Sequence, residues 1–194
     1  MKNSIYDFVF KGLLTENALD KTDRIPKQAY SAFVEMSTVD KLPFELLDDS
    51  FSSAGKKMAA VYVALFSFEN SVRKFVSDLL LEKVGENWWV TCVQQNMKQK
   101  AESRLEEEKK ILWHAPRGDE PINFLDFGDL AKIMTSNENW ARFEPYIRDQ
   151  EWAKNLLTSL ERSRNVIMHS GSLGERDIER IGTLMEDWLQ QIGS

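Results

Sequence analysis

The stretch "SRNVIMHSG", residues 163–171, places an arginine, an amide and an imidazole at the end of an otherwise apolar helical pattern. Upstream of it, apolar side chains recur at helical spacing, and Arg164 falls within their stripe, four residues after Leu160 and three before Ile167. A guanidinium that leaves water needs a paired acceptor, because an unpaired buried charge is prohibitively costly. We therefore expect Arg164 to meet an acceptor inside the fold.

The spacing within this stretch restricts how its polar groups can meet. Asn165 and His169 are four residues apart and share a face if the helix continues that far. Arg164 and His169 are five apart, which separates them by about 140° around a helix of 3.6 residues per turn. One continuous helix therefore cannot direct both at one small ligand. Either the helix opens before His169, as Ser170 and Gly171 would allow, or a second copy of the chain supplies the missing half.

These side chains suit the cleavage of a phosphodiester. An arginine can stabilise the charge that develops on a phosphorane through forked hydrogen bonds. An imidazole near neutrality can take a proton from a 2′-hydroxyl or give one to a leaving 5′-oxygen. Together they could cleave RNA by internal transesterification without a metal. The alternative is structural, with Arg164 paired to a core carboxylate and His169 favoured by the field of the helix C-terminus.

Composition limits the class of protein. The chain has 194 residues, 42% of them hydrophobic, and a net charge of −6, as expected of an ordinary globular protein with a sizeable core. No apolar run reaches the roughly 18 residues needed to span a bilayer, so we expect a cytoplasmic protein that does not enter the membrane. The acidic balance argues against a broad basic surface for nucleic acid but allows a small local site.

Cysteine and histidine are scarce. The single cysteine, Cys92, excludes an internal disulfide and is consistent with a reducing compartment. His114 and His169 are the only histidines, and no Cys/His set accompanies them, which argues against a zinc site. We therefore expect neither a metal nor a cofactor.

The pattern along the chain is almost wholly helical, because no β-branched run alternates with period two for more than a few residues. An apolar stripe of steps of three and four predicts one long helix, residues 56–84, ended by Gly85. Asp126 is expected to cap a later helix, with Asp129 in its first turn. The other expected helices cover residues 4–20, 26–36, 94–112, a short one after 135–140, 149–168 and 175–192, and residues 37–54 are expected to be a connection with at most a short helical turn. This predicts an all-α domain, residues 55–194, after an N-terminal helical extension, residues 1–54.

Two segments resemble the HEPN superfamily (higher eukaryotes and prokaryotes nucleotide-binding domains). "RNVIMH", residues 164–169, resembles its Arg-Asn-x-x-x-His signature, and "LFSFENSVRKFV", residues 65–76, resembles the earlier helix whose acidic residue and arginine face that signature. With "FLDFGDLAKIM" and "NENWARFEPYI" between them, the chain is similar to a branch that includes the C-terminal HEPN domain of a eukaryotic RNA-quality-control endonuclease and many bacterial relatives. The resemblance covers about residues 55–192.

The resemblance implies an antiparallel helical bundle that forms a homodimer, with the two motifs facing each other across a cleft. Active members are metal-independent endoribonucleases of toxin–antitoxin, antiphage and RNA-surveillance systems. By position, Arg164 would stabilise the phosphate, His169 would act as general acid or base, and Asn165 would hold the motif or the scissile backbone. Glu69 would orient Arg164, with Arg73 as the intrahelical neighbour of Glu69.

Two other functions stay open at this point. The chain could be a non-catalytic helical module for RNA binding, protein interaction or dimerisation, in which the motif is a structural remnant. It could also be a toxin whose partner, such as a nucleotidyltransferase-like antitoxin, modifies or blocks it. The expected partners are accordingly RNA, a second copy of the chain, and an antitoxin or defence-system protein.

Overall fold

The computed structural model describes residues 38–193, so the helices expected over 4–20 and 26–36 lie outside the described residues. Within the described range the chain is all helical, without a strand, and the predicted all-α fold is confirmed. The elements in order are η1 (Phe44–Leu46), α3 (Asp49–Val84), α4 (Trp88–Cys92), α5 (Gln95–Lys109), η2 (Pro121–Phe124), α6 (Phe127–Thr135), α7 (Trp140–Ile147), α8 (Gln150–Met168) and α9 (Glu175–Gly193).

The chain divides into two compact units, Met1–Ser52 and Ser53–Ser194, and each is described by itself. The assignment of residues 1–54 as a separate helical extension stays a prediction, since most of them lie outside the described range. Among residues 38–193, no helix combines the length and the apolar character needed to cross a membrane.

Helix α3 starts earlier than its sequence predicts. We expected a connection over residues 37–54, and this is wrong, because α3 begins at Asp49. The oxygen Oδ1 of Asp48 accepts the backbone N–H of Ser50 at 2.9 Å and its hydroxyl at 2.5 Å. Short polar side chains that break a helix in its interior stabilise its first turn, where N–H groups lack partners. The other end agrees with the prediction, since Gly85 follows α3 with a φ of 84°.

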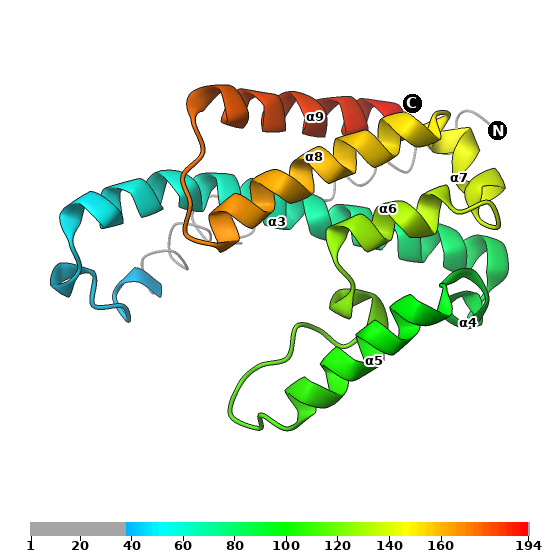
Figure 1. Cartoon of the computed structure of the whole chain (residues 1–194), viewed down its shortest axis with the longest axis horizontal. Coiled ribbons are helices and arrows are strands. Elements are labelled where there is room, and N and C mark those ends of the chain that lie inside the picture. The colour runs from blue at the N-terminus through cyan, green and yellow to red at the C-terminus, as the bar shows by residue number, and fades with distance from the viewer. Residues whose placement is uncertain (1–37, 194) are drawn as a thin grey trace, which may run out of the picture. The chain divides into compact units, whose positions relative to one another are not determined.

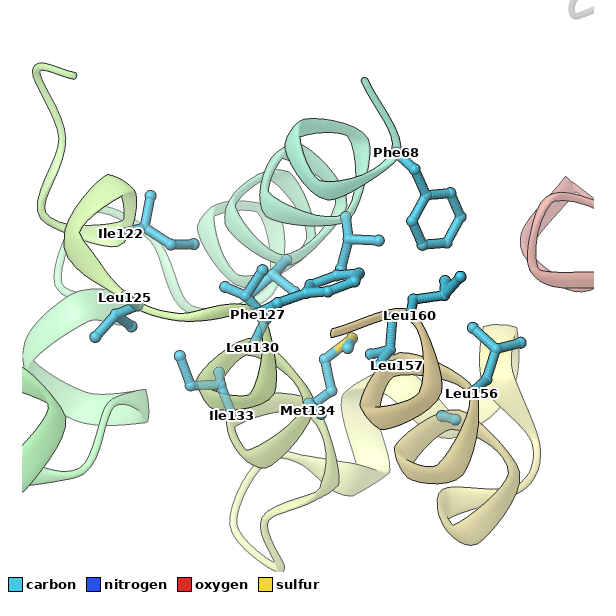
Figure 2. Close-up of a cluster of buried hydrophobic side chains, with 14 of the residues drawn as sticks. Phe68, Ile122, Leu125, Phe127, Leu130, Ile133, Met134, Leu156, Leu157 and Leu160 are labelled. Carbon is cyan, nitrogen blue, oxygen red and sulfur yellow. The ribbon is translucent and has the colours of Figure 1, made fainter. Parts of the chain in front are cut away.

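In the second unit, α8 packs against both α9 and α6, and it runs antiparallel to each of them (Figure 1). Figure 2 shows the interior of this arrangement, where Phe68 of α3 faces side chains of α6 and α8. Apolar residues at helical spacing fill it, and the burial of each such side chain contributes about 1.5–3 kcal/mol. The buried members include Val72, Val76, Leu80, Leu130, Met134, Leu156, Leu157 and Leu160.

Trp188 ties α9 to this core. Its side chain is buried. Its ring meets Phe68 and Phe75 of α3 edge to face, with both pairs of centroids 6.1 Å apart. It also stacks on Trp152 of α8 at 6.1 Å and an interplanar angle of 8°. One indole therefore contacts the two helices that carry the acidic residue and the motif singled out in the sequence.

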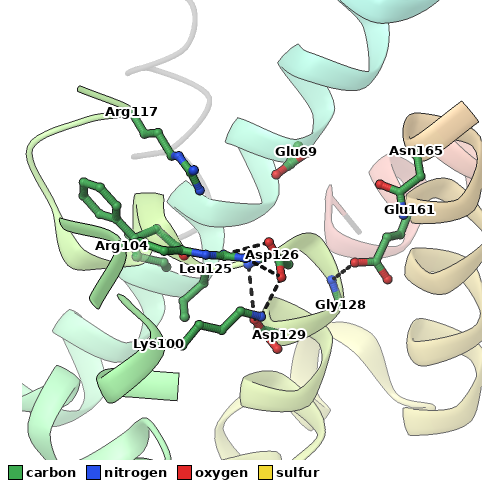
Figure 3. A network of polar contacts seen from close by, with 12 residues as sticks. Glu69, Lys100, Arg104, Arg117, Leu125, Asp126, Gly128, Asp129, Glu161 and Asn165 are labelled. Atoms are coloured by element: carbon green, nitrogen blue, oxygen red, sulfur yellow. Dashed lines mark hydrogen bonds and ion pairs between the residues drawn. The ribbon is translucent and has the colours of Figure 1, made fainter. Parts of the chain in front are cut away.

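Helix α5 is charged, as its sequence predicts, and an ionic network joins it to the start of α6 (Figure 3). Arg104 donates to both carboxylate oxygens of Asp126, at 2.8 and 3.2 Å. Lys100 lies 2.5 Å from Asp126 and 2.6 Å from Asp129. The two aspartates also form a capping box at the N-terminus of α6, which confirms the predicted cap. Burial raises the pKa of the Asp126 carboxyl, but hydrogen bonds from Arg104 and Lys100 outweigh burial and lower this pKa to about 2.

The lowered pKa of Asp126 predicts a loss of stability in acid. The unfolded chain protonates this carboxyl near its usual pKa of about 3.9, whereas the folded chain keeps it ionised down to about pH 2. The stabilisation is therefore complete above about pH 4 and is lost as the pH falls toward 2. We expect Asp126→Asn, which keeps the shape and removes the charge, to weaken this dependence in urea unfolding titrations at stepped pH. Asp119→Asn removes an exposed carboxylate outside the network and should preserve the steep wild-type dependence; equal slopes for Asp126→Asn and wild type would contradict the account.

Candidate functional site

The site is built around a buried carboxylate on α3. Glu69 is only 8% exposed, and its carboxylate lies between two arginines. Arg73, one turn later on α3, pairs with Oε1 of Glu69, and Arg164 of α8 lies with its Nε 3.5 Å from Oε2. Because a buried carboxylate without partners is strongly destabilising, this carboxylate fixes both guanidinium groups in place. The ion pair expected between Glu69 and Arg164 is thus present.

Arg164 meets the acceptor that its place in the apolar stripe requires, but it stays partly in water. Its side chain stays 34% exposed, and the buried charge of the pair is that of Glu69. Nη1 of Arg164 donates to Oδ1 of Asn165 at 3.3 Å. The remaining N–H donors of this guanidinium are therefore available to an anion.

Arg73 is used differently. Besides its pair with Glu69, its Nη1 donates to the carbonyl oxygens of Ile122 at 2.6 Å and Leu125 at 3.0 Å. The guanidinium of Arg73 thus has three acceptors, one on α3 and two in the segment that leads into α6. It connects α3 to η2 through Ile122 and to the residue after η2, Leu125. We interpret Arg73 as a residue that positions Glu69, and Arg164 as the arginine with donors to spare.

A pocket of about 270 Å³ opens beside Arg164. Its lining includes Glu69, Arg73, Arg164 and a third arginine, Arg117, from the loop between α5 and η2. Arg117 is held by Glu108 of α5, with Nε 2.5 Å from Oε1 and its backbone N–H donating to Oε2 at 3.0 Å. Figure 3 shows Arg117 and Glu69 on the same side of the α5–α6 network. Sequence reasoning missed Arg117, because it follows a turn and no local spacing relates it to α3 or α8.

His169 lies outside this pocket. The backbone N–H of His169 still donates to the carbonyl of Asn165 at 3.1 Å, so the proposal that the helix opens before His169 is wrong. The chain turns only afterwards, with Ser170 at a φ of 61° and the Gly171 N–H bonded to the Val166 carbonyl at 2.8 Å. These bonds form a Schellman closure, in which His169 is the C-terminal cap of α8. Its side chain is exposed and, unlike Arg164, is not among the described residues that line the pocket.

A contact one turn before the motif holds α8 in register with α6. The backbone N–H of Gly128 donates to Oε1 of Glu161 at 3.0 Å (Figure 3). A Cβ at position 128 would lie 2.7 Å from Oε2 of Glu161, so a side chain there would push this carboxylate away. The glycine of "DFGDL" therefore permits a close contact that positions the helix carrying Arg164.

Comparison with known families agrees with this geometry. Residues 63–193 match the family described as Swt1-like HEPN, which is more than half of the 194-residue chain. The chain belongs to the HEPN superfamily. The matched range contains Glu69, Arg73 and the whole of "RNVIMH", so the HEPN resemblance found in the sequence is confirmed. No curated protein and no solved structure matches the chain.

Membership of the HEPN superfamily indicates a function that involves RNA, and often ribonuclease activity. The individual roles of Arg164, Asn165 and His169 stay predictions. Within residues 38–193, no group of three or more His, Cys, Asp or Glu side chains is arranged to hold a metal ion. A single copy of this HEPN domain thus brings together Glu69, Arg73 and Arg164, with Asn165 attached to Arg164, and leaves His169 apart.

The burial of Glu69 predicts a large stability loss on neutralisation. Glu69→Gln keeps the volume but replaces charge-assisted hydrogen bonds to two arginines, and we expect the free energy of unfolding to fall by about 1.5–3 kcal/mol in urea titrations. Asp78→Asn is the matched control, because Asp78 forms a pair with Lys74 on the same helix at the same i,i+4 spacing, and both side chains are exposed. It should change stability far less. Equal effects of the two substitutions would show that burial of Glu69 does not matter.

Proposed function

We propose that the chain is a metal-independent endoribonuclease that cleaves single-stranded RNA by attack of a 2′-hydroxyl on the adjacent phosphate. The observation that carries this proposal is the state of Arg164. The buried Glu69 carboxylate orients its guanidinium at 3.5 Å, and yet a third of the side chain is exposed beside a pocket. An arginine held in advance in this way provides donors where negative charge develops in the transition state, which is the most effective form of electrostatic catalysis.

The proposed reaction needs only proton transfer and charge stabilisation. A base removes the proton of the 2′-hydroxyl, the 2′-oxygen forms a bond to phosphorus, and the bond from phosphorus to the 5′-oxygen breaks. The leaving 5′-oxygen then takes a proton from an acid, which leaves a cyclic phosphate and a 5′-hydroxyl. His169 would act as base or acid, since an imidazole exchanges protons near neutral pH. Arg164 would neutralise the phosphorane oxygens, and Asn165 would hold Arg164 or the scissile backbone.

A second copy would bring His169 to the site. Within one copy, Arg164 and His169 point away from each other, because α8 stays helical up to the cap. A two-fold axis near the end of α8 would place His169 of one copy opposite Arg164 of the other. The motif itself exposes two apolar side chains, Val166 and Met168, and Phe66 of α3 is exposed as well. Exposed apolar side chains that gather in one place are typical of an interface.

The biological setting follows from the family resemblance and belongs to the same proposal. A ribonuclease of this kind would act in bacterial defence, in a toxin–antitoxin pair or in RNA control. An antitoxin or defence-system protein would then cover the motif or the Arg164 pocket. The position of His169 outside the pocket of one copy favours one rival function, a non-catalytic HEPN module for RNA binding, protein interaction or dimerisation.

The proposed chemistry predicts cleavage in the presence of EDTA. Single-stranded RNA should yield products with a 5′-hydroxyl and a cyclic or 3′ phosphate, and DNA of the same sequence should remain intact because it lacks the 2′-oxygen. His169→Ala should lower the cleavage rate by about 10²–10⁴-fold. Arg164→Ala should lower it by about 10²–10³-fold through the lost phosphate donors.

Folding is the necessary control for these variants. His169 is exposed, so its alanine variant should unfold at the wild-type urea concentration, whereas Arg164→Ala also removes a partner of buried Glu69 and must be compared at a temperature where it is folded. Cleavage that needs a divalent ion, or that is unchanged in His169→Ala, would contradict the mechanism and leave the non-catalytic module as the better function.

A composite site across two copies predicts that two impaired variants restore each other. In a mixed dimer of Arg164→Ala and His169→Ala chains, one site combines the intact Arg164 of one copy with the intact His169 of the other. Refolding the two variants together should therefore recover cleavage well above either variant alone, and sedimentation should show a dimer. A monomer at tens of micromolar, or no recovery in proven mixed dimers, would exclude a shared site.

A further inference from the structure

The loop between α5 and η2 exposes a tryptophan. In "KILWHAPRGDE", residues 110–120, Leu112 is 94% exposed and Trp113 is 87% exposed. Large apolar side chains on a surface commonly mark a binding site when they gather in one place. Helix α5 and this loop extend away from α8 and α9, so Trp113 does not belong to the core that those helices form (Figure 1).

Arg117 joins this loop to the Arg164 pocket. Its side chain lines that pocket together with Glu69 and Arg164. It also lines a second hollow, of about 600 Å³, together with Trp113 and His114. Arg117 thus borders both spaces, so a ligand that extends from Arg164 past Arg117 reaches Trp113.

The groups along this path include Arg117, Trp113 and His114, and the second hollow is also lined by Glu107 and by Glu108, the partner of Arg117. The stretch "KKILWHAPR", residues 109–117, has three cations and no acidic residue in a chain whose net charge is −6. The rings of Trp113 and His114 meet edge to face, with centroids 5.8 Å apart and an interplanar angle of 82°. An edge contact leaves a face of the indole open to solvent. Open aromatic faces interleaved with basic side chains are the arrangement by which proteins hold single-stranded nucleic acid.

We propose that Trp113 and Arg117 of residues 110–117, a segment here named the aromatic arm, bind the RNA strand beyond the scissile phosphate. Trp113 stacks on an unpaired base. Arg117 contacts a phosphate that lies between that base and the scissile phosphate at Arg164. This inference rests on the proposed function, because it extends the RNA site at Arg164. Stacking on Trp113 would make the enzyme selective for strands with at least one unpaired base outside the cleavage point, because bases within a duplex are already stacked on their neighbours.

The same loop could instead dock a protein. The neighbouring side chains of Leu112 and Trp113 distinguish a protein ligand from RNA. An apolar protein surface would use Leu112 and Trp113 alike, because both are almost fully exposed. A nucleic-acid base gains from the aromatic face of Trp113 and little from Leu112. Leu112→Ala is therefore the matched control for Trp113→Ala.

The test measures binding separately from cleavage. A fluorescein-labelled single-stranded RNA of about 12 nucleotides, within the site sizes known for such proteins, is titrated by anisotropy with the His169→Ala protein and with double variants made from it. Adding Trp113→Ala should weaken binding by about tenfold, within the range known for loss of one stacked base. Trp113→Phe should recover part of this loss, Leu112→Ala should bind as its parent does, and the corresponding RNA duplex should be insensitive to Trp113.

Salt separates the role of Arg117 from that of Trp113. Loss of one phosphate contact to a single strand should reduce the slope of log K against log salt by about 0.7. Arg117→Gln should show this reduction, whereas Trp113→Ala should weaken binding without changing the slope. Equal effects of Trp113→Ala and Leu112→Ala, the same effect of Trp113→Ala on duplex as on single strand, or no RNA binding at all would overturn the inference. RNA binding that depends on Trp113 in a wild-type protein that does not cleave would refute the proposed nuclease and leave the aromatic arm standing.

Discussion

A carboxylate that is almost excluded from water must be neutralised from within the fold, and the Glu69 carboxylate sets this requirement for the whole HEPN domain. Arg73 and Arg164 meet it together, from α3 and α8. Arg73 extends the constraint to the carbonyls of Ile122 and Leu125, so the chain leading into α6 is fixed by the same charge. Three segments distant in sequence thus share one electrostatic centre, and the apolar core beneath them holds the helices at the distance that this centre needs.

The second ionic centre, at the start of α6, shows by contrast what a purely structural network looks like. There Arg104 and Lys100 share Asp126 and Asp129, and the backbone of the capping box uses the same carboxylates. The Arg104 guanidinium also donates to the carbonyl of Phe124, which leaves little of it for a ligand. Arg164 differs because one carboxylate orients it from one side and solvent reaches the other. This difference in occupancy, more than charge itself, separates a candidate catalytic arginine from a structural one.

Much of this organisation is legible in the sequence, because it depends on local periodicity. The stripe through Leu160 and the cap at Asp126 follow from helical spacing, and the resemblance to the HEPN superfamily points to Glu69 as the partner of Arg164. The features that the sequence did not predict depend on tertiary context. Polar residues near Asp48 suggested a connection, but they cap α3. Arg117 follows an irregular loop, so only the folded chain brings it to Arg164. The partial exposure of Arg164 does not follow from its place in an apolar stripe, because the stripe does not reveal where the helix meets the edge of the bundle.

The Schellman closure after α8 separates the part of the motif that folding needs from the part that it does not. Glu69 and Arg164 are bound into the helix packing, so random substitution at either is opposed by selection for a folded protein alone. His169 caps α8 through its backbone, and its exposed ring is available for loss without harm to that packing. In a lineage that no longer needs cleavage, the histidine should therefore drift first, while the acid–arginine pair persists. An intact histidine among divergent members would then be the better record of retained activity, and an intact arginine only a record of the fold.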